Sequence, residues 1–325
     1  MSAEDLVPDE ENALVLTAGG YIKRTNPDEF RKQKRGGVGV VDLDTKEEDF
    51  VTQFLTASTH NDLLFFSDRG KAYQLKMYEL PEGKRATKGK SIMNFLSLEQ
   101  GEQVTSILPM PKEVKASEGL ALLMVTKNGT VKKTAADKFR EVRRSGLLSI
   151  TLDKGDALIC AQFVRKGDSV VLTTSKGQSI RFAEDDVREM GRQAAGVRGM
   201  KLGGGDLIVG AGVAPKESKD AALLVVSSTG YGKKTKLSEY KIQGRGGSGI
   251  KTMSITPKTK QLVGAAVVMG DGGELVAMSK KSQTIRTGLD EIPTLSRATQ
   301  GVRVMKMREG DAVASFVVFE GGEDA

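Results

Sequence analysis

The residues of this sequence that could take part in chemistry are mostly lysine and arginine. Of 325 residues, 49 are Lys or Arg, whereas His60 is the one histidine and Cys160 the one cysteine. Disulfide frameworks, zinc sites and histidine-based catalysis need several such residues at defined spacings. The sequence therefore predicts no metal, no cofactor and no catalytic site. The chemistry that remains is the binding of anions by ammonium and guanidinium groups.

Three other candidates for chemistry have structural explanations. His60 precedes an apolar strand and is expected in a turn or a satisfied polar role, and Cys160 lies in an apolar run that is expected in the core. The segment GKRATKGKS at 83–91 is close to a phosphate-binding loop, but five residues separate its glycines where the motif has four. No helix pattern follows it. We therefore expect that this chain alone is not an enzyme.

The charge of the chain is unevenly distributed. The net charge is +7, but residues 1–11 carry −5 and residues 320–325 carry −3, so residues 12–319 carry +15. A body of that sign attracts polyanions, and nucleic acid is the commonest of these in a cytoplasm. No apolar run approaches the length of a membrane span, and the acidic N-terminus lacks an apolar leader. We expect a cytoplasmic protein with no membrane contact, an acidic linker stub at 1–11 and a short acidic tail at 320–325.

A repeat of about fifty residues organises the chain. Two apolar strands joined by a turn occur six times, with the turn at Gly20, Gly70, Gly129, Gly177, Gly230 and Ser282. A second glycine follows each turn by 17 or 19 residues, at Gly39, Gly89, Gly146, Gly196, Gly249 and Gly301. In five of the six units an acidic residue then opens another apolar strand. Two phases that stay locked over six copies indicate six equivalent structural units.

Each unit reads as four strands, with little helical periodicity anywhere. Four strands make one blade of a propeller, so residues 12–319 are predicted to form a single all-β domain of six blades around an axis. A solenoid is the alternative arrangement. The expected blades are 13–61, 62–118, 119–166, 167–219, 220–271 and 272–319.

Basic residues recur at two phases of this repeat. One phase is three and four residues after the turn, at Lys23, Arg24, Lys132, Lys133, Arg181, Lys233, Lys234 and Arg286. The other phase surrounds the second glycine and includes Arg31, Lys32, Lys84, Arg85, Lys88, Lys90, Arg143, Arg144, Arg192, Arg198, Arg245, Lys251, Arg297 and Arg303, with Lys71 beside a turn. On six equivalent blades, we expect these positions to form one continuous basic band along the rim. Such a band suits the regularly spaced phosphates of a bent duplex.

The first of these loops, QKRGGVG at Gln33 to Gly39, resembles the signature box of the C-terminal domain of bacterial DNA gyrase A. That box reads Gln, basic, Arg, Gly, Gly, basic, Gly. Gln33, Lys34, Arg35, Gly36, Gly37 and Gly39 match it, and Val38 stands where the family has a second basic residue. Other stretches along essentially the whole chain, such as GYIKR, NGTVKKT and TGYGKKT, also resemble this family. QGRGGSG, at 243–249, is a partial second copy that serves either as a second DNA contact or as a turn that needs glycine.

The resemblance implies a six-bladed β-pinwheel that wraps duplex DNA around its rim in a positive sense, largely independently of sequence. It implies partners as well: the remainder of gyrase A together with gyrase B in an A2B2 holoenzyme, a type IIA topoisomerase whose ATP-driven strand passage introduces negative supercoils. The domain alone is expected to be monomeric. Two alternatives stay open: the related C-terminal domain of topoisomerase IV, and a propeller that serves as a protein-interaction scaffold.

Overall fold

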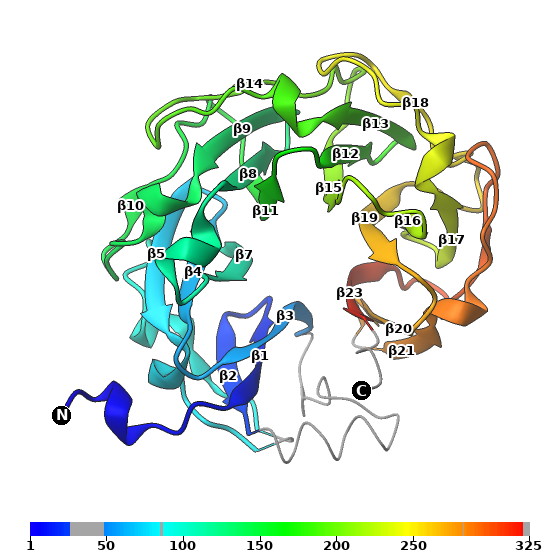
Figure 1. The fold of residues 1–325 in the computed structure, drawn as a ribbon. Coiled ribbons are helices and arrows are strands. Elements are labelled where there is room, and N and C mark those ends of the chain that lie inside the picture. Colours follow the sequence, from blue (N-terminus) through cyan, green and yellow to red (C-terminus); the bar gives the residue numbers. More distant parts are fainter. Residues whose placement is uncertain (27–48, 85–86, 282, 321–325) are drawn as a thin grey trace.

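The computed structural model describes residues 1–26, 49–84, 87–281 and 283–320. They form six small antiparallel sheets arranged around a central axis (Figure 1). The fold is thus all-β and propeller-like with six blades, as the repeat predicts. The helices of this part of the chain are 3-10 turns of three or four residues. They are Glu4–Leu6, Met77–Glu79, Ile92–Asn94, Val114–Ser117, Ala136–Phe139, Glu184–Asp186, Leu237–Glu239 and Leu289–Glu291.

In each of the first five sheets, an inner strand, two hairpin strands and a two-residue outer strand follow one another outward from the axis. The first sheet contains β3 (Val51–Ser58), β1 (Glu11–Thr17), β2 (Tyr21–Thr25) and β6 (Lys90–Ser91). The second contains β7 (Val104–Pro109), β4 (Asp62–Ser67), β5 (Lys71–Lys76) and β10 (Leu147–Leu148). The third contains β11 (Leu158–Arg165), β8 (Leu120–Thr126), β9 (Thr130–Ala135) and β14 (Val197–Arg198).

The other three sheets repeat this plan. The fourth contains β15 (Ile208–Ala214), β12 (Ser169–Thr174), β13 (Gln178–Ala183) and β18 (Ile250–Lys251). The fifth contains β19 (Leu262–Met269), β16 (Ala221–Ser227), β17 (Tyr231–Lys236) and β22 (Val302–Arg303). The described residues of the sixth form three strands, β23 (Val313–Glu320), β20 (Gly273–Ser279) and β21 (Thr284–Gly288).

The outer strand of each complete sheet comes from the next unit of sequence. β6 follows the second glycine of the second unit, yet it pairs with β2 of the first, with Tyr21 opposite Ser91. The same exchange brings β10, β14, β18 and β22 to the preceding sheets. The blade limits expected from the repeat therefore differ from the sheets observed, because the second to sixth units each give three strands to one sheet and one to the preceding sheet. This exchange covers edges that would otherwise be open.

The acidic residue of the repeat fastens the inner strand to the hairpin turn. The Asp49 carboxylate accepts hydrogen bonds from the Thr17 hydroxyl at 2.7 Å and from the backbone N–H of Gly19 at 2.8 Å. Asp206 does the same for the Ser175 hydroxyl at 2.8 Å and the N–H of Lys176 at 3.0 Å. A carboxylate at this phase thus satisfies turn donors that would otherwise lack a partner.

The described residues form six apolar core clusters, one between each pair of adjacent sheets. The middle strands are buried on both faces; every residue of β8, for example, is buried. Alternation of polar and apolar residues is therefore lost in these strands, as expected for a sheet with both faces covered.

The cluster between the sixth and first sheets closes the ring. It contains Val15 and Val51 of the first sheet with Val276 of the sixth. The Ser315 hydroxyl also donates to the carbonyl of Val51 at 2.8 Å, and the rings of Phe54 and Phe319 lie 4.3 Å apart. The inner strands therefore contact one another all the way around the axis.

Candidate nucleic-acid interface

The predicted cationic residues divide into two groups by burial. The group that follows the hairpin turns includes five buried lysines, Lys23, Lys132, Lys133, Lys233 and Lys234. An exposed position was expected for them, and the structure shows otherwise. The reason is the strand exchange: the loop that arrives from the next unit lies over β2, β9 and β17 and covers their side chains. These lysines are not part of a surface that DNA could reach.

The lysine three residues after the turn binds the carbonyl oxygens of the covering loop. Lys132 Nζ donates to the loop carbonyls of Gly191 at 2.9 Å, Arg192 at 2.7 Å and Ala194 at 3.1 Å. It also donates to the carbonyl of Ser149, which follows β10 in its own unit, at 2.5 Å. Lys233 Nζ donates to those of Ser296 at 2.7 Å, Arg297 at 2.7 Å and Thr299 at 2.9 Å. Lys23 donates to the carbonyl of Lys84 at 3.1 Å.

Burial shifts the proton affinity of two of these lysines. Desolvation lowers the pKa of Lys132 to about 8, and the nearby positive charge of Arg192 acts in the same direction. Desolvation likewise lowers the pKa of Lys233 to about 8, with Glu239 opposing the shift and Arg297 adding to it. Burying the two charged ammonium groups therefore costs free energy.

The cation four residues after the turn binds a different element, the short 3-10 turn of the next unit. Lys133 pairs with Glu184 of one such turn at 2.6 Å, and Lys234 donates to the carbonyl of Leu289 in another at 2.6 Å. Lys234 also pairs at 2.5 Å with Asp271, which lies between β19 and β20. Arg181 donates to the carbonyl of Leu237 at 3.0 Å, and desolvation lowers the pKa of its guanidinium. Three cations of this phase thus connect consecutive units.

Arg24 and Arg286 are half-buried members of the same phase. Arg24 donates to the carbonyl of Leu80 at 2.9 Å and to the Asn12 side-chain oxygen at 2.7 Å. Arg286 pairs with Glu274 at 3.4 Å. Both are therefore occupied within the protein.

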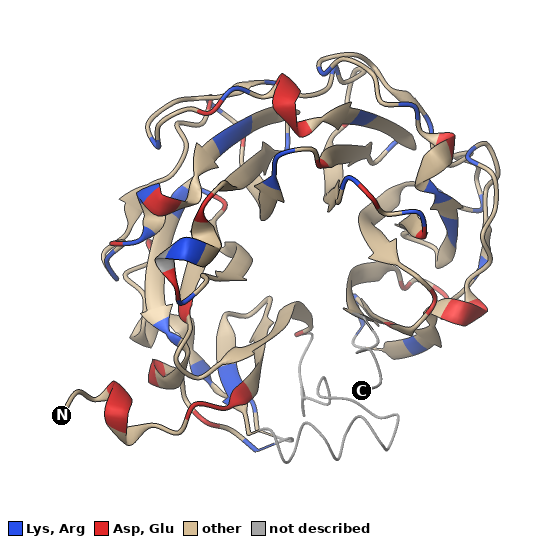
Figure 2. Cartoon of the chain, in the orientation of Figure 1, with Lys and Arg blue, Asp and Glu red and all other residues tan. Residues whose placement is uncertain are grey.

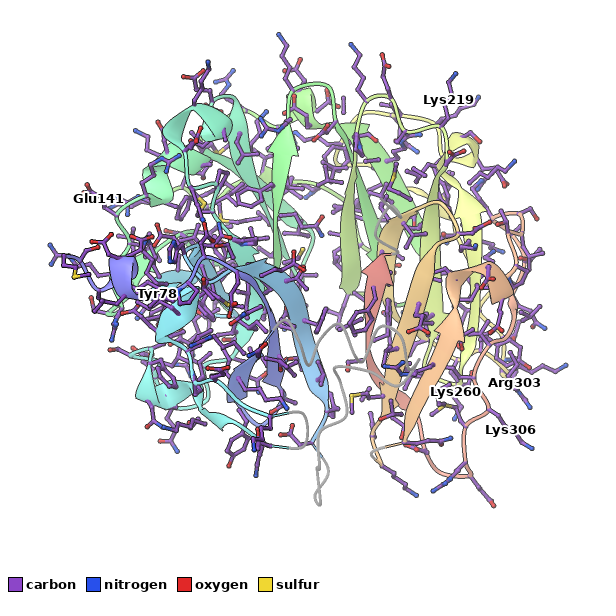
Figure 3. All side chains as sticks on the ribbon, turned by 60° about the horizontal axis from the view of Figure 1, so that its bottom comes forward. Tyr78, Glu141, Lys219, Lys260, Arg303 and Lys306 are labelled. Carbon is purple, nitrogen blue, oxygen red and sulfur yellow. The ribbon has the colours of Figure 1, made fainter. Side chains whose placement is uncertain are left out.

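The second group lies in the loops around the second glycine. Its exposed members are Lys84, Lys88, Lys90, Arg143, Arg144, Arg198, Arg245, Lys251 and Arg303. Lys71, Arg192 and Arg297 are half-buried. These loops run along the outer perimeter of the ring, where Figure 2 shows Lys and Arg recurring from sheet to sheet. Figure 3 shows the side chains of Arg303 and Lys306 extending away from this outer edge.

The loops pass close over the underlying strand because of glycine. Gly196 has φ +91°, and a Cβ there would lie 2.5 Å from the carbonyl oxygen of Val131. Gly89 has φ +85°, and a Cβ would lie 2.4 Å from the carbonyl oxygen of Ile22. Any other residue would be strained at these positions and would push the outer strand away.

Neighbouring perimeter loops also contact each other. Arg245 donates to the carbonyl of Arg198 at 3.0 Å, and Arg297 donates to that of Lys251 at 3.1 Å. Arg144 forms an ion pair with Glu79, and Lys71 lies 3.5 Å from Glu99. Some cations of the band are therefore partly neutralised.

The signature box lies outside the described residues, as do Arg31, Lys32 and Arg85. Contact with DNA therefore stays a prediction for the residues of the box, which are Gln33, Lys34, Arg35, Gly36, Gly37 and Gly39.

The partial second copy of the box, at 243–249, lies within the described residues. In it the N–H of Gly246 donates to the carbonyl of Gly199 at 2.7 Å, and the N–H of Lys201 donates to the carbonyl of Gly247 at 2.9 Å. This copy is thus a turn hydrogen-bonded to the preceding perimeter loop, with positive φ at Gly246 and Gly249.

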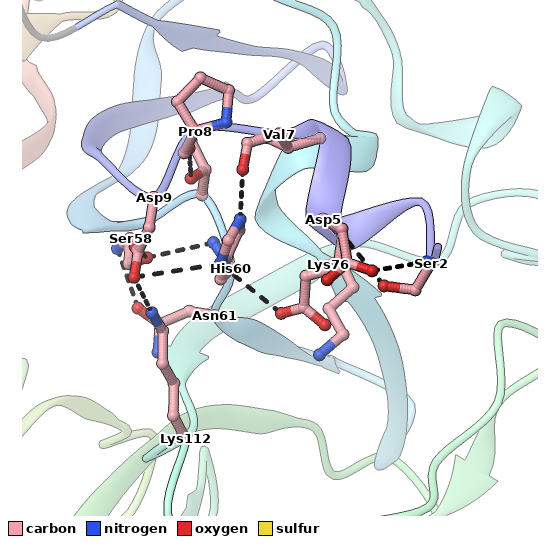
Figure 4. Close-up of polar contacts among 12 residues, drawn as sticks. Ser2, Asp5, Val7, Pro8, Asp9, Ser58, His60, Asn61, Lys76 and Lys112 are labelled. Carbon is pink, nitrogen blue, oxygen red and sulfur yellow. Dashed lines mark hydrogen bonds and ion pairs between the residues drawn. The ribbon is translucent and has the colours of Figure 1, made fainter.

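His60 holds the acidic N-terminal segment against the ring (Figure 4). Its Nε2 lies 2.7 Å from the carbonyl oxygen of Val7, and its Nδ1 lies 3.8 Å from Glu4 and 3.9 Å from Asp9. Asp9 also pairs with Lys112 at 2.7 Å. The polar role expected of His60 is therefore filled by contacts with a segment whose docking the sequence did not predict.

In the described part of the chain, no group of three or more His, Cys, Asp or Glu residues is placed to hold a metal ion. In the same residues, no helix has the length and apolar character that crossing a membrane requires.

The chain resembles known proteins over nearly its whole length. A family model described as "DNA gyrase C-terminal domain, beta-propeller" matches residues 11–58, 61–109, 121–162, 168–215, 221–269 and 273–320. The chain belongs to the DNA gyrase C-terminal domain family. DNA gyrase A of Lawsonia intracellularis is 40% identical over 321 residues, which is 99% of this chain and 39% of that protein. DNA gyrase A of Escherichia coli is 37% identical, over 97% of this chain and 35% of that protein.

Solved structures of this family and of a related one superimpose on the ring. A gyrase A C-terminal domain has a TM-score of 0.76 and 26% identity, covering 95% of this chain and all of that chain. A topoisomerase IV C-terminal domain has a TM-score of 0.78 and 26% identity, covering 97% and 94%. The chain spans about two fifths or less of the length of the gyrase A proteins it matches.

Proposed function

We propose that this member of the gyrase C-terminal domain family is a non-catalytic domain of DNA gyrase A that binds duplex DNA and wraps it around the perimeter loops. The observation that carries this proposal is the recurrence of exposed Lys and Arg in equivalent loops of consecutive sheets. Cations repeated along a curved edge can neutralise phosphates in register without reading bases.

The energetics of bending agree with such a surface. Bending 20–30 base pairs by 40–90° costs about 1–6 kcal/mol, which several phosphate contacts can offset through counterion release. The contributing cations are the exposed loop residues, and the five buried lysines are excluded from the contact set. The box at Gln33 to Gly39 remains part of the proposal as a basic loop at the same phase of the repeat.

In the complete protein, a positive wrap would present a segment of the same DNA to the strand-passage machinery. We place the domain in an A2B2 assembly with the remainder of gyrase A and with gyrase B, where ATP-driven passage would introduce negative supercoils. The domain would be monomeric by itself and the assembly cytoplasmic.

A topology assay tests the wrap. Nicked circular DNA is ligated with increasing amounts of the 325-residue chain, and the linking number of the products is measured by gel electrophoresis. We expect a positive shift that grows with bound protein. Products identical to those of free DNA would overturn the proposal, and DNA binding without a shift would leave a basic surface that does not wrap.

Salt dependence tests the phosphate contacts. If about six of the exposed loop cations each neutralise one phosphate, the logarithm of the binding constant should fall with the logarithm of salt concentration with a slope of about −5. A slope near zero would contradict the proposal. Absence of DNA binding at physiological salt would instead favour a protein-interaction scaffold.

The topoisomerase IV C-terminal domain is a second candidate, because a structure of that type superimposes with a TM-score of 0.78. Introduction of negative supercoils by the complete enzyme separates a gyrase domain from a topoisomerase IV domain.

The role of the box is tested by substitution. Replacement of Lys34 to Gly39 by alanine in the complete gyrase A protein, assembled with gyrase B, should abolish negative supercoiling and spare relaxation. Supercoiling that persists would refute the role of the box.

A further inference from the structure

The position three residues after each hairpin turn alternates between lysine and uncharged residues. It is Lys23, Lys132 and Lys233 in the first, third and fifth units, and Tyr73, Ile180 and Ile285 in the others. Lys132 and Ile180 are both fully buried at corresponding places in β9 and β13. Because isoleucine fills the position equally well in the neighbouring sheet, a charge there is not required to form the sheet.

What the three lysines share is the contact made by their Nζ atoms. Each reaches the backbone of the loop that crosses over from the next unit, just before the outer strand that pairs with the lysine's own strand. In the third and fifth sheets, carbonyl oxygens of consecutive or nearly consecutive loop residues converge on one ammonium group. Several carbonyl dipoles pointing to one place repel each other unless a cation lies between them.

The same loops carry exposed cations of the proposed DNA surface. Arg198 follows the loop held by Lys132, Arg303 follows the loop held by Lys233, and Lys84 and Lys88 lie in the loop held by Lys23. Lys132 and Lys233 form no ion pair among the described residues, so their charge is balanced by backbone dipoles. A buried cation of this kind is costly, and its retention needs a reason other than sheet stability.

We propose that Lys23, Lys132 and Lys233 are positioning residues, whose ammonium groups gather the carbonyl oxygens of the crossover loops and so fix the cations of those loops in the arrangement that wrapped DNA requires. The inference rests on the proposed function. On this proposal, a buried lysine holds the crossover loop in the first, third and fifth sheets. An apolar or aromatic residue takes the same place in the second, fourth and sixth sheets.

The test replaces Lys132 and Lys233 by methionine, which keeps an unbranched side chain of similar length. Lys132→Met/Lys233→Met is compared with the 325-residue wild-type chain and with Lys138→Met/Lys236→Met, a control that removes the same charge at exposed positions. Two quantities are measured: the linking-number shift per bound chain, and the affinity for a linear duplex of about 15 base pairs, too short to wrap.

We expect the Lys132→Met/Lys233→Met variant to lose at least half of the linking-number shift while its affinity for the short duplex changes less than about threefold, since the exposed cations remain. Hydrogen exchange of the Ala194 amide, which donates to Gly191 at 3.2 Å, should become faster in this variant. The control should match the wild type in both DNA measurements and in exchange. A simple structural role would lower affinity and linking shift together.

An unchanged linking-number shift in the Lys132→Met/Lys233→Met variant would overturn the inference while leaving the proposed function intact. If the wild-type chain itself gives no linking-number shift, the proposed function fails. Hydrogen exchange of the loop amides then reports separately whether the lysines order the loops. If the double variant loses its β-sheet circular dichroism, Lys132→Met alone is used. Loss of the fold in this single variant would overturn the inference, because it would make the lysine a determinant of the sheet.

Discussion

At the scale of single residues, the same amino acid has two functions in this chain according to whether a neighbouring loop covers it. Lys132 is fully buried and bound to carbonyl oxygens, whereas Lys251 is exposed in a perimeter loop. Counting basic residues by phase cannot separate the two, because both phases recur with the repeat. The alternation of lysine with tyrosine or isoleucine three residues after the turn is the signal in the sequence that could have indicated burial.

The depressed pKa of Lys132 and Lys233 predicts how stability depends on pH. The folded protein releases these protons near pH 8, and the unfolded chain releases them near 10.5, so the unfolded state binds more protons between these values. The free energy of unfolding should therefore rise with pH in this window, by up to about 1.4 kcal/mol per pH unit for each lysine.

Urea titrations at several pH values measure this effect. Its signature is the difference between wild type and Lys132→Met/Lys233→Met, since the variant lacks both groups and should not show their part of the rise. Parallel curves for the two proteins from pH 8 to 10 would contradict the lowered proton affinity.

At the scale of elements, the hairpins and their spacing follow from the sequence, whereas the partner of each outer strand does not. The period of about fifty residues and the turn glycines predict six hairpins. Two residues such as Val197 and Arg198 carry too little apolar pattern to show whether they pair within their own unit or with the preceding one. The position of Gly196, which needs a positive φ to bring the chain close over β9, decides the pairing.

Replacing that glycine should weaken the exchange. In Gly196→Ala, the new Cβ would lie 2.5 Å from the carbonyl oxygen of Val131 at φ +91°, so we expect a loss of about 1–3 kcal/mol in the free energy of unfolding. Urea denaturation measures the loss, and faster hydrogen exchange in β14 and β9 locates it.

Gly204→Ala is the matched control for this substitution. Gly204 has no atom within 4 Å of a Cβ and does not have a positive φ, so alanine there should be neutral or slightly stabilising. Equal losses at the two positions would show that backbone entropy, and not the crossing over β9, explains the effect.

At the scale of the whole molecule, the proposed wrapping of DNA along one curved surface requires the ring to stay closed. Adjacent sheets from the first to the sixth are joined by exchanged outer strands as well as by apolar clusters. The contact between the sixth and first sheets includes Phe54 against Phe319 and Val15 with Val276 in one apolar cluster. These two sheets come from opposite ends of the six units, whereas every other pair of adjacent sheets is also consecutive in the chain. We therefore expect this seam to be the first part of the ring to open.

Phe54→Ala tests this expectation. Removing a half-buried ring whose centroid lies 4.3 Å from that of Phe319 should cost about 1–3 kcal/mol. Phe163→Ala is the comparison, because Phe163 is a half-buried ring on an inner strand between the second and third sheets, which are consecutive in the chain. Both substitutions remove a half-buried ring and should lose similar amounts of packing.

Hydrogen exchange and DNA wrapping distinguish the two variants. Only Phe54→Ala should speed hydrogen exchange in β1, β3, β20 and β23 while the other sheets stay protected. Because an open seam breaks the continuity of the rim, the same variant should also give a smaller linking-number shift than Phe163→Ala. Equal exchange and equal shifts in the two variants would mean that the seam is as firmly joined as the rest of the ring.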